Sequence, residues 1–287
     1  MYRANVKNYL SLVKFAHTIF ALPFALIGFF LATRVDGYSF SWILLLLVLL
    51  CMLFARNAAM SFNRYADRLF DGLNPRTAKR EIPASLIPPG AALAFAIINS
   101  LLFVAATWFI NPVCFWLSPL ALAVILGYSY SKRYTSLAHF ILGLGLSLAP
   151  SGAYLAVAGH FSVLPVVLSL AVLLWVSGFD IIYALQDDAF DRSQRLHSIP
   201  ALLGRKRALI LSAVLHSIVV ILLCWMGYSG NFGPIYWVGF GVFTGLLFYQ
   251  HILVNPFDLS RVNVAFFTLN GIASILFATS TIADLFF

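Results

Sequence analysis

The sequence NRYADRLFDGLNPRTAKR, residues 63–80, ends a long apolar segment and concentrates an amide, two carboxylates and several cations. Asn63, Asp67 and Asp71 are spaced i, i+4, i+8, which places all three on one face of a helix. Two carboxylates one turn apart repel each other unless a cation lies between them. Mg²⁺ suits this position because it binds one or two carboxylates together with water and phosphate oxygens. The stretch therefore predicts a helix end that holds Mg²⁺.

Three cations, Arg76, Lys79 and Arg80, follow the acidic residues. Cations in this arrangement suit a polyanion such as diphosphate. The alternative is a solvated helix end whose cations only mark the cytoplasmic side of a membrane. The spacing alone leaves both interpretations open.

A second copy of the pattern favours the binding site. The sequence YALQDDAFDR, residues 183–192, repeats the i, i+4, i+8 spacing with Tyr183, Asp187 and Asp191. The tail RLHSIP at 195–200 is similar to KREIP at 79–83. Because both copies end apolar segments, we expect two metal-binding helix ends that face one pocket.

The composition is that of a membrane protein. Hydrophobic residues make up 62% of the 287 residues and charged residues only 10%. Apolar runs of about 20 residues, enough to span a bilayer, recur along the whole chain. The formal charge of +8 comes from cations scattered over short loops, so the positive-inside rule explains it and nucleic acid is not expected as a partner.

The sequence predicts an all-α, polytopic fold with a surface helix at about 3–15 and nine membrane spans. The spans are expected at 15–33, 40–66, 91–110, 113–129, 137–158, 164–186, 208–228, 236–254 and 262–285. Pro150 predicts a kink or break in the fifth span. With nine spans, every Lys and Arg except Arg34 falls on the side of the N-terminus, so that side is expected to be cytoplasmic and to carry both acidic motifs.

The two motifs, 120 residues apart, suggest one domain built from two pseudo-repeats, at about 15–130 and 137–254, with an additional ninth span. Aromatic residues make up 16% of the chain. A ligand with a charged head and a long apolar tail fits this combination, which indicates a polyprenyl diphosphate. Mg²⁺ and cations would stabilise the departing diphosphate, and aromatic faces would stabilise the allylic cation.

The motifs resemble those of the UbiA-type membrane prenyltransferases. The resemblance rests on the two acidic motifs, HTIFALPF at 17–24, NPRT at 74–77 and YSYSKR at 128–133. It is greatest for the 4-hydroxybenzoate polyprenyltransferases, which join a polyprenyl chain to an aromatic acid in quinone biosynthesis. The resemblance implies a Mg²⁺-dependent enzyme in the bacterial cytoplasmic membrane, with the N-terminus in the cytoplasm.

The resemblance also implies roles for individual residues. Asn63, Asp67, Asp71, Asp187 and Asp191 would hold Mg²⁺, with the four aspartates acting in catalysis. Arg76, Arg80 and Lys132 would contact diphosphate oxygens, and Tyr128 and Tyr183 would line the centre where the cation forms.

Three further residues remain open to alternatives. Arg56 either binds the carboxylate of the aromatic acceptor or pairs with a motif acid. Asp180 either accepts the aromatic proton or orients the acceptor hydroxyl, or it pairs with Arg56. Asp188, which the resemblance does not account for, is expected to be solvated. The six histidines are dispersed and receive no role.

The acceptor is also open. A dihydroxynaphthoate, the precursor of menaquinone, needs the same carboxylate contact as 4-hydroxybenzoate. Outside this class, a divalent-cation transporter would use intramembrane acids, but its sites lie near the bilayer midplane. A lipid phosphotransferase would share paired aspartates and Mg²⁺ but normally shows an Asp-Gly-xx-Ala-Arg signature, and Asp71-Gly72 is not followed by one.

Overall fold

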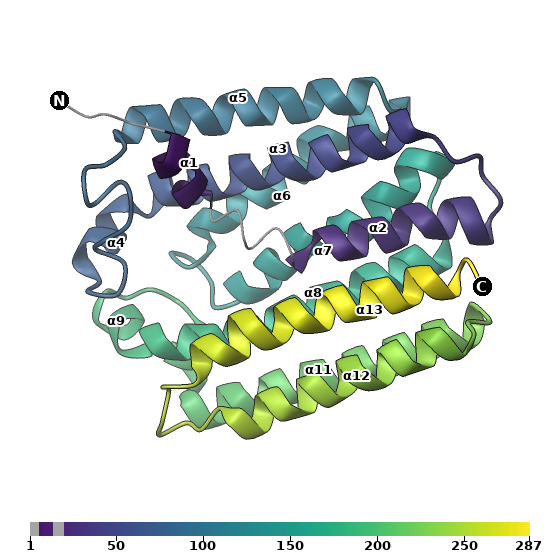
Figure 1. Cartoon of the computed structure of the whole chain (residues 1–287). Helices are drawn as coiled ribbons and strands as arrows, with labels where there is room; N and C mark the ends of the chain where they lie inside the picture. The colour runs from purple at the N-terminus through teal and green to yellow at the C-terminus, as the bar shows by residue number, and fades with distance from the viewer. Residues whose placement is uncertain (1–5, 14–19) are drawn as a thin grey trace.

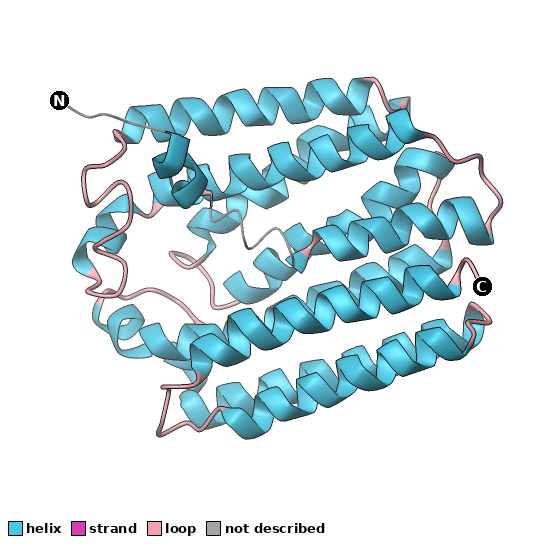
Figure 2. Cartoon of the chain, in the orientation of Figure 1, coloured by secondary structure: helices cyan, strands magenta, loops and turns pink. Residues whose placement is uncertain are grey.

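The computed structural model describes residues 6–13 and 20–287 and consists of long helices that lie side by side (Figure 1). Within these described residues there is no β-strand (Figure 2). The predicted all-α membrane fold is confirmed.

Seven helical segments are long and apolar enough to cross a membrane. They are α3 (Trp42–Ala66), α5 (Pro89–Trp108), α6 (Pro112–Ser131), α7 (Ala138–Ala158), α8 with its continuation (Val163–Ser193), α11 (Arg205–Ser229) and η4 with α13 (Val264–Asp284). The first predicted span corresponds to a shorter segment, α2 (Leu22–Phe30) with η2 (Leu31–Val35), and residues 14–19 lie outside the described residues. The eighth predicted span corresponds to α12 (Pro234–Leu253), which is not among these seven helices. Its last turn carries the polar residues Gln250 and His251. The count of nine spans stays a prediction.

Tight packing joins α2 to α7. A Cβ at Gly28 would lie 2.0 Å from the carbonyl oxygen of Pro150, so only glycine permits this approach. Small residues of this kind allow membrane helices to pack closely, which matters because lipid gives little hydrophobic drive for association. Pro150 does not interrupt α7, which is continuous from Ala138 to Ala158. Of the two alternatives predicted for the fifth span, a break is therefore wrong, and a kink stays a prediction.

Helix α8 (Val163–Ala184) forms the centre of the bundle. Trp175, its largest buried side chain, packs on Phe24 of α2 at a ring distance of 5.2 Å and on Phe243 of α12 at 5.9 Å. Phe277 of α13 contacts Phe243 at 5.3 Å. These aromatic contacts hold α2, α12 and α13 around α8, the helix that carries the second acidic motif.

Short helices follow α3 and α8 at the same end of the bundle. They are α4 (Arg68–Leu73) after α3, and η3 (Leu185–Asp187), α9 (Asp188–Ser193) and α10 (Ile199–Leu203) after α8 (Figure 1). The N-terminal helix α1 (Val6–Leu12) lies near this end, and its Leu12 is buried against Ile82 and Ile87 of the loop after α4. This end therefore carries both acidic motifs, as the sequence predicts.

Candidate active site

The two acidic motifs share an irregularity at their middle aspartate. Asp67 separates α3 from α4 with φ −92° and ψ 6°, and Asp187 precedes α9 with φ −106° and ψ 3°. The spacing predicts one helix through each motif, whereas the structure interrupts the helix at the middle aspartate. The turn persists in the first motif, because the Asp67 N–H still donates to the Asn63 carbonyl at 2.9 Å and the Asp71 N–H to that of Asp67 at 2.8 Å.

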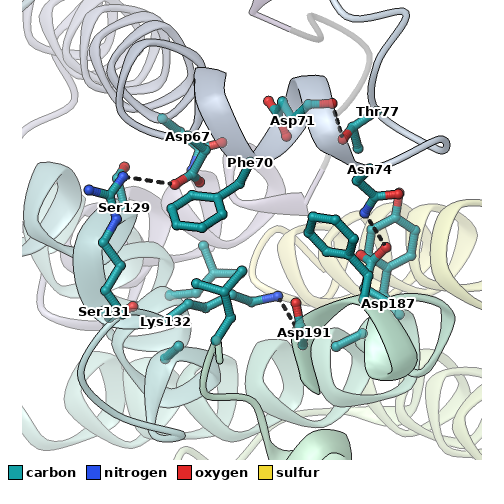
Figure 3. A pocket seen from close by; sticks show the side chains of 18 of the residues that line it. Asp67, Phe70, Asp71, Asn74, Thr77, Ser129, Ser131, Lys132, Asp187 and Asp191 are labelled. Carbon is teal, nitrogen blue, oxygen red and sulfur yellow. Dashed lines mark hydrogen bonds and ion pairs between the residues drawn. The ribbon is translucent and has the colours of Figure 1, made fainter. Parts of the chain in front are cut away.

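Both motifs line one polar cavity of about 200 Å³ (Figure 3). Eleven predicted site residues line it: Asn63, Asp67, Asp71, Arg76, Arg80, Tyr128, Lys132, Asp180, Tyr183, Asp187 and Asp191. The expectation that separate parts of the chain meet in one pocket is confirmed. Two predicted residues lie elsewhere: Arg56 lines a neighbouring cavity, and Lys79 is exposed.

Asp187 is held by residues of the first motif's loop. Its Oδ1 accepts hydrogen bonds from Arg76 Nε at 2.9 Å and from Asn74 Nδ2 at 3.0 Å, and its Oδ2 pairs with a terminal nitrogen of Arg76. The other terminal nitrogen of Arg76 donates to the Tyr183 hydroxyl at 2.8 Å. Asn74 is a site residue that the sequence reasoning missed, although it begins the NPRT motif.

Asp71 and Asp191 each face a cation. Asp71 Oδ1 lies 2.7 Å from a terminal nitrogen of Arg80, and Asp191 Oδ2 lies 3.4 Å from Lys132 Nζ. Burial alone would lower the pKa of Lys132, but the carboxylates of Asp191 and Asp180 raise it. Lys132 is therefore a fixed positive charge between two acids.

Asp67 lies in an electrostatically unfavourable position. Burial and the neighbouring Asp71 raise its pKa to about 6, against the opposing effect of Arg133. Its Oδ2 accepts from Asn63 Nδ2 at 2.9 Å, and its Oδ1 lies 3.5 Å from Arg133. Arg133, a second residue missed by the sequence reasoning, also donates to the Ala66 carbonyl at 2.6 Å, at the C-terminus of α3 where cations are favoured.

The donor set fits a hard divalent cation. Aspartate and asparagine oxygens are the ligands that Mg²⁺ prefers. Asp71 Oδ2 is buried and has no hydrogen-bond partner among the described residues, which leaves one carboxylate oxygen for a cation. In residues 6–13 and 20–287, no group of three or more His, Cys, Asp or Glu side chains is arranged to hold a metal alone. Asp71 Oδ2 and the neighbouring carboxylates are the groups that would hold a divalent cation in this cavity.

A second, apolar cavity of about 600 Å³ adjoins the polar one. Tyr128 and Leu142 line both cavities, so they mark the junction. The apolar cavity extends along α6 as far as Cys114 and includes Arg56 in its wall. Its lining also contains Leu120 and Leu144, which are exposed on the outer surface of the helices, so this cavity reaches the lipid-facing side.

Asp180 lies on the wall of the polar cavity and contacts a histidine. Its Oδ2 lies 2.7 Å from His139 Nδ1, where α7 packs against α8. The Asp180 contact that the structure describes is therefore with His139, and a pair with Arg56 stays a prediction. His139 is a third residue that sequence reasoning missed, because its partner is 41 residues away and no local pattern marks it.

Asp188 is not solvated, and the expectation is corrected here. Only 3% of the residue is exposed. Its two oxygens accept from Arg205 Nε and from a terminal nitrogen of Arg205, both at 2.9 Å, and Arg192 donates to Oδ2 at 2.6 Å. Because Arg205 begins α11, Asp188 ties the second motif to the next long helix.

Comparison with known proteins agrees with this geometry. The model of the UbiA prenyltransferase family matches residues 21–272. The chain belongs to this family. This UbiA-family member is a membrane-embedded prenyltransferase, and the predicted enzyme class is confirmed. Residues 17–19 of the HTIFALPF stretch lie outside the described residues.

Relatives and solved structures of the UbiA family extend the match over most of the chain. A 4-hydroxybenzoate octaprenyltransferase of Tolumonas auensis is 32% identical, over 83% of each chain. The apo structure of a UbiA homologue from Aeropyrum pernix superposes with a TM-score of 0.84 at 35% identity, covering 93% of this chain and 98% of the other. A UbiA homologue from Archaeoglobus fulgidus, bound to GPP and Mg²⁺, has the same fold, with a TM-score of 0.74 at 22% identity over 98% and 100% of the two chains.

Proposed function

We propose that this enzyme transfers a polyprenyl group from polyprenyl diphosphate to a hydroxylated aromatic acid of the 4-hydroxybenzoate type, with Mg²⁺, in quinone biosynthesis. The observation that carries the proposal is the junction at Tyr128 between a charged cavity and an apolar one. A polyprenyl diphosphate has this division between head and tail. The Tolumonas auensis relative is named for the same reaction.

In the polar cavity, the carboxylates are proposed to bind the metal ion and the cations to bind the diphosphate oxygens. The side chains that would hold Mg²⁺ are Asn63, Asp67, Asp71, Asp187 and Asp191, and the bound ion would neutralise the charge that develops on the departing diphosphate. In the structure, three of these aspartates pair with cations: Asp187 with Arg76, Asp71 with Arg80, and Asp191 with Lys132. When substrate arrives, these three cations exchange carboxylate oxygens for diphosphate oxygens. The site thus stays close to electrically balanced before and after binding.

Two aromatic residues face the carbon from which diphosphate leaves. Tyr128 is at the junction of the cavities, and Tyr183 stacks on Phe266 with a ring distance of 4.1 Å. When the C–O bond breaks, its electron pair leaves with diphosphate and an allylic cation remains. The faces of the two rings stabilise this cation, and the apolar wall excludes water that would otherwise capture it.

Arg56 and Asp180 are the candidates for the acceptor. Arg56 lines the apolar cavity and binds the acceptor carboxylate, and Asp180 lines the polar cavity and faces the hydroxyl or the departing ring proton. A π pair of the ring forms the new C–C bond, and the ring proton then leaves to restore aromaticity. A dihydroxynaphthoate offers the same carboxylate and hydroxyl and is the second candidate acceptor.

The arrangement in the membrane follows from the charges. We place the N-terminus and both motifs at the cytoplasmic face of a bacterial inner membrane, because the loops at that end carry the cations. We also retain a single domain built from two pseudo-repeats, 15–130 and 137–254, because both halves end a long helix with an irregular aspartate. The position of the acids at helix ends disfavours a transporter, whose site lies near the midplane.

The test is diphosphate release by purified protein in nanodiscs, with octaprenyl diphosphate, Mg²⁺ and a panel of phenolic acids. We expect acceptor-dependent release with 4-hydroxybenzoate, a prenylated product of matching mass, and loss of both when EDTA removes the metal. Comparison with 1,4-dihydroxy-2-naphthoate separates the two acceptors. Failure to prenylate any acceptor, with Mg²⁺ and lipid present, would overturn the proposal.

A further inference from the structure

His139 makes one hydrogen bond from each ring nitrogen while remaining fully buried. Its Nδ1 lies 2.7 Å from Asp180 Oδ2, and its Nε2 lies 3.3 Å from the backbone nitrogen of Ile199. Ile199 begins α10, directly after the loop that follows the second acidic motif. One imidazole therefore connects α7, a residue of the polar cavity and this loop.

The two partners determine the tautomer. A backbone N–H can only donate, so His139 Nε2 must present its lone pair to Ile199. The ring proton then resides on Nδ1, from which it is donated to Asp180. The arrangement corresponds to an imidazole that donates from Nδ1 and accepts at Nε2.

In this tautomer the ring donates to only one of the two carboxylate oxygens of Asp180. Oδ2 is held by the buried ring, whereas Oδ1 has no hydrogen-bond partner among the described residues. The side chain is 19% exposed and lines the polar cavity with Tyr128 and Lys132. Oδ1 is therefore the oxygen available to a molecule in the cavity.

We propose that His139 is a positioning residue that holds the Asp180 carboxyl group and orients Oδ1 toward the acceptor. This inference rests on the proposed function, since it gives Asp180 its task in prenyl transfer. Oδ1 accepts a hydrogen bond from the acceptor hydroxyl, or the ring proton once the C–C bond has formed. His139 does not relay that proton onward, because Nδ1 already carries one and Nε2 faces a donor rather than an acceptor.

The first test leaves the chain unaltered. In ¹⁵N-histidine-labelled protein, the signal assigned to His139 by its absence from H139N should show one protonated nitrogen, Nδ1, and one unprotonated nitrogen, Nε2. An imidazolium, or a ring protonated on Nε2, would overturn the proposal. Since this readout needs no turnover, it stands even if no acceptor is prenylated.

The second test separates the two hydrogen bonds. An asparagine amide lies near the position of Nδ1, so H139N retains the donor to Asp180, whereas H139A removes it. We expect H139A to lower kcat for prenyl transfer about 10- to 100-fold, the range for partners that orient a reacting group. The KM for prenyl diphosphate should change less than about threefold, and H139N should recover most of kcat.

A double-mutant cycle with Asp180 distinguishes a positioning role from a merely structural one. If His139 acts through Asp180, H139A should not lower kcat further in the D180A background. An equal loss in both backgrounds, or no rescue by H139N, would contradict the proposal. S177A is the matched control: the Ser177 hydroxyl donates to the His139 carbonyl at 3.2 Å without touching the ring, and its loss should leave kcat unchanged.

Discussion

Arg76 and Asp187 form an ion pair that joins residues 111 positions apart in the chain. Arg76 belongs to the loop after the first acidic motif, and Asp187 is the middle acid of the second motif. The guanidinium contacts both oxygens of the carboxylate, at 2.9 Å from Nε to Oδ1, and the Asp187 side chain is only 11% exposed. This ion pair therefore links the two motifs directly.

Removal of Arg76 should destabilise the metal-free enzyme and make its stability depend on Mg²⁺. R76A leaves Asp187 buried without its main partner, and loss of one member of a buried pair costs about 3–5 kcal/mol. Because a bound cation can replace the guanidinium, Mg²⁺ should recover part of the lost melting temperature. Thermal unfolding in detergent, with and without Mg²⁺, measures both effects. K79A alters an exposed cation of the same loop and should change neither. A Mg²⁺-independent loss in R76A would argue against a cation site at Asp187.

Neutralising Asp67 should stabilise the metal-free protein while abolishing activity. Its pKa is raised to about 6 in the folded state, so the folded protein holds a proton more tightly than the unfolded chain. Stability is thus present at low pH and is lost as pH rises through 6. D67N stays neutral and should be more stable than the parent at pH 7.5, by roughly 1 kcal/mol after allowance for solvent screening. The difference should be roughly halved near pH 5 and should vanish only below about pH 4, where Asp67 is protonated in both states. Equal stability of D67N and parent at both pH values would contradict the position assigned to Asp67.

Asp188 should matter for stability through Arg205 and not through Arg192. The Arg205 pair holds both oxygens of a buried carboxylate, whereas the Arg192 side chain is 52% exposed. R205A should lower the free energy of unfolding by about 3 kcal/mol or more, and R192A by less than about 1 kcal/mol. Denaturation of the three proteins side by side gives the ranking. The reverse order would mean that α9 is not held by α11.

The apolar cavity should limit the length of the prenyl chain. Cys114 and Tyr128 lie near opposite ends of α6, which has 20 residues and is about 30 Å long, and both line this cavity. C114F fills the end remote from Tyr128. We expect kcat/KM to fall about tenfold or more with octaprenyl diphosphate and to change little with geranyl diphosphate. W116F, on the exposed face of the same helix, is the control. An equal loss with both substrates would place the tail elsewhere.

Much of the site could be predicted because its signals are local. The spacing of Asn63, Asp67 and Asp71 and its repeat at Tyr183, Asp187 and Asp191 are visible in the chain, and the charge bias of the loops placed both motifs at one end. The helix breaks at Asp67 and Asp187 were not predicted, because neither stretch contains glycine or proline at the break. Only the way the chain packs after each long helix decides the conformation there.

By itself the sequence predicted a helical membrane protein with two acidic helix ends that face one pocket. These features could be predicted because hydropathy and i, i+4 spacing depend only on neighbours in the chain. The tertiary structure alone decided which cation each acid meets, that Asp188 is buried, and that His139 holds Asp180. These contacts join residues that come together only when the helices pack, and their energy depends on burial that no linear pattern records.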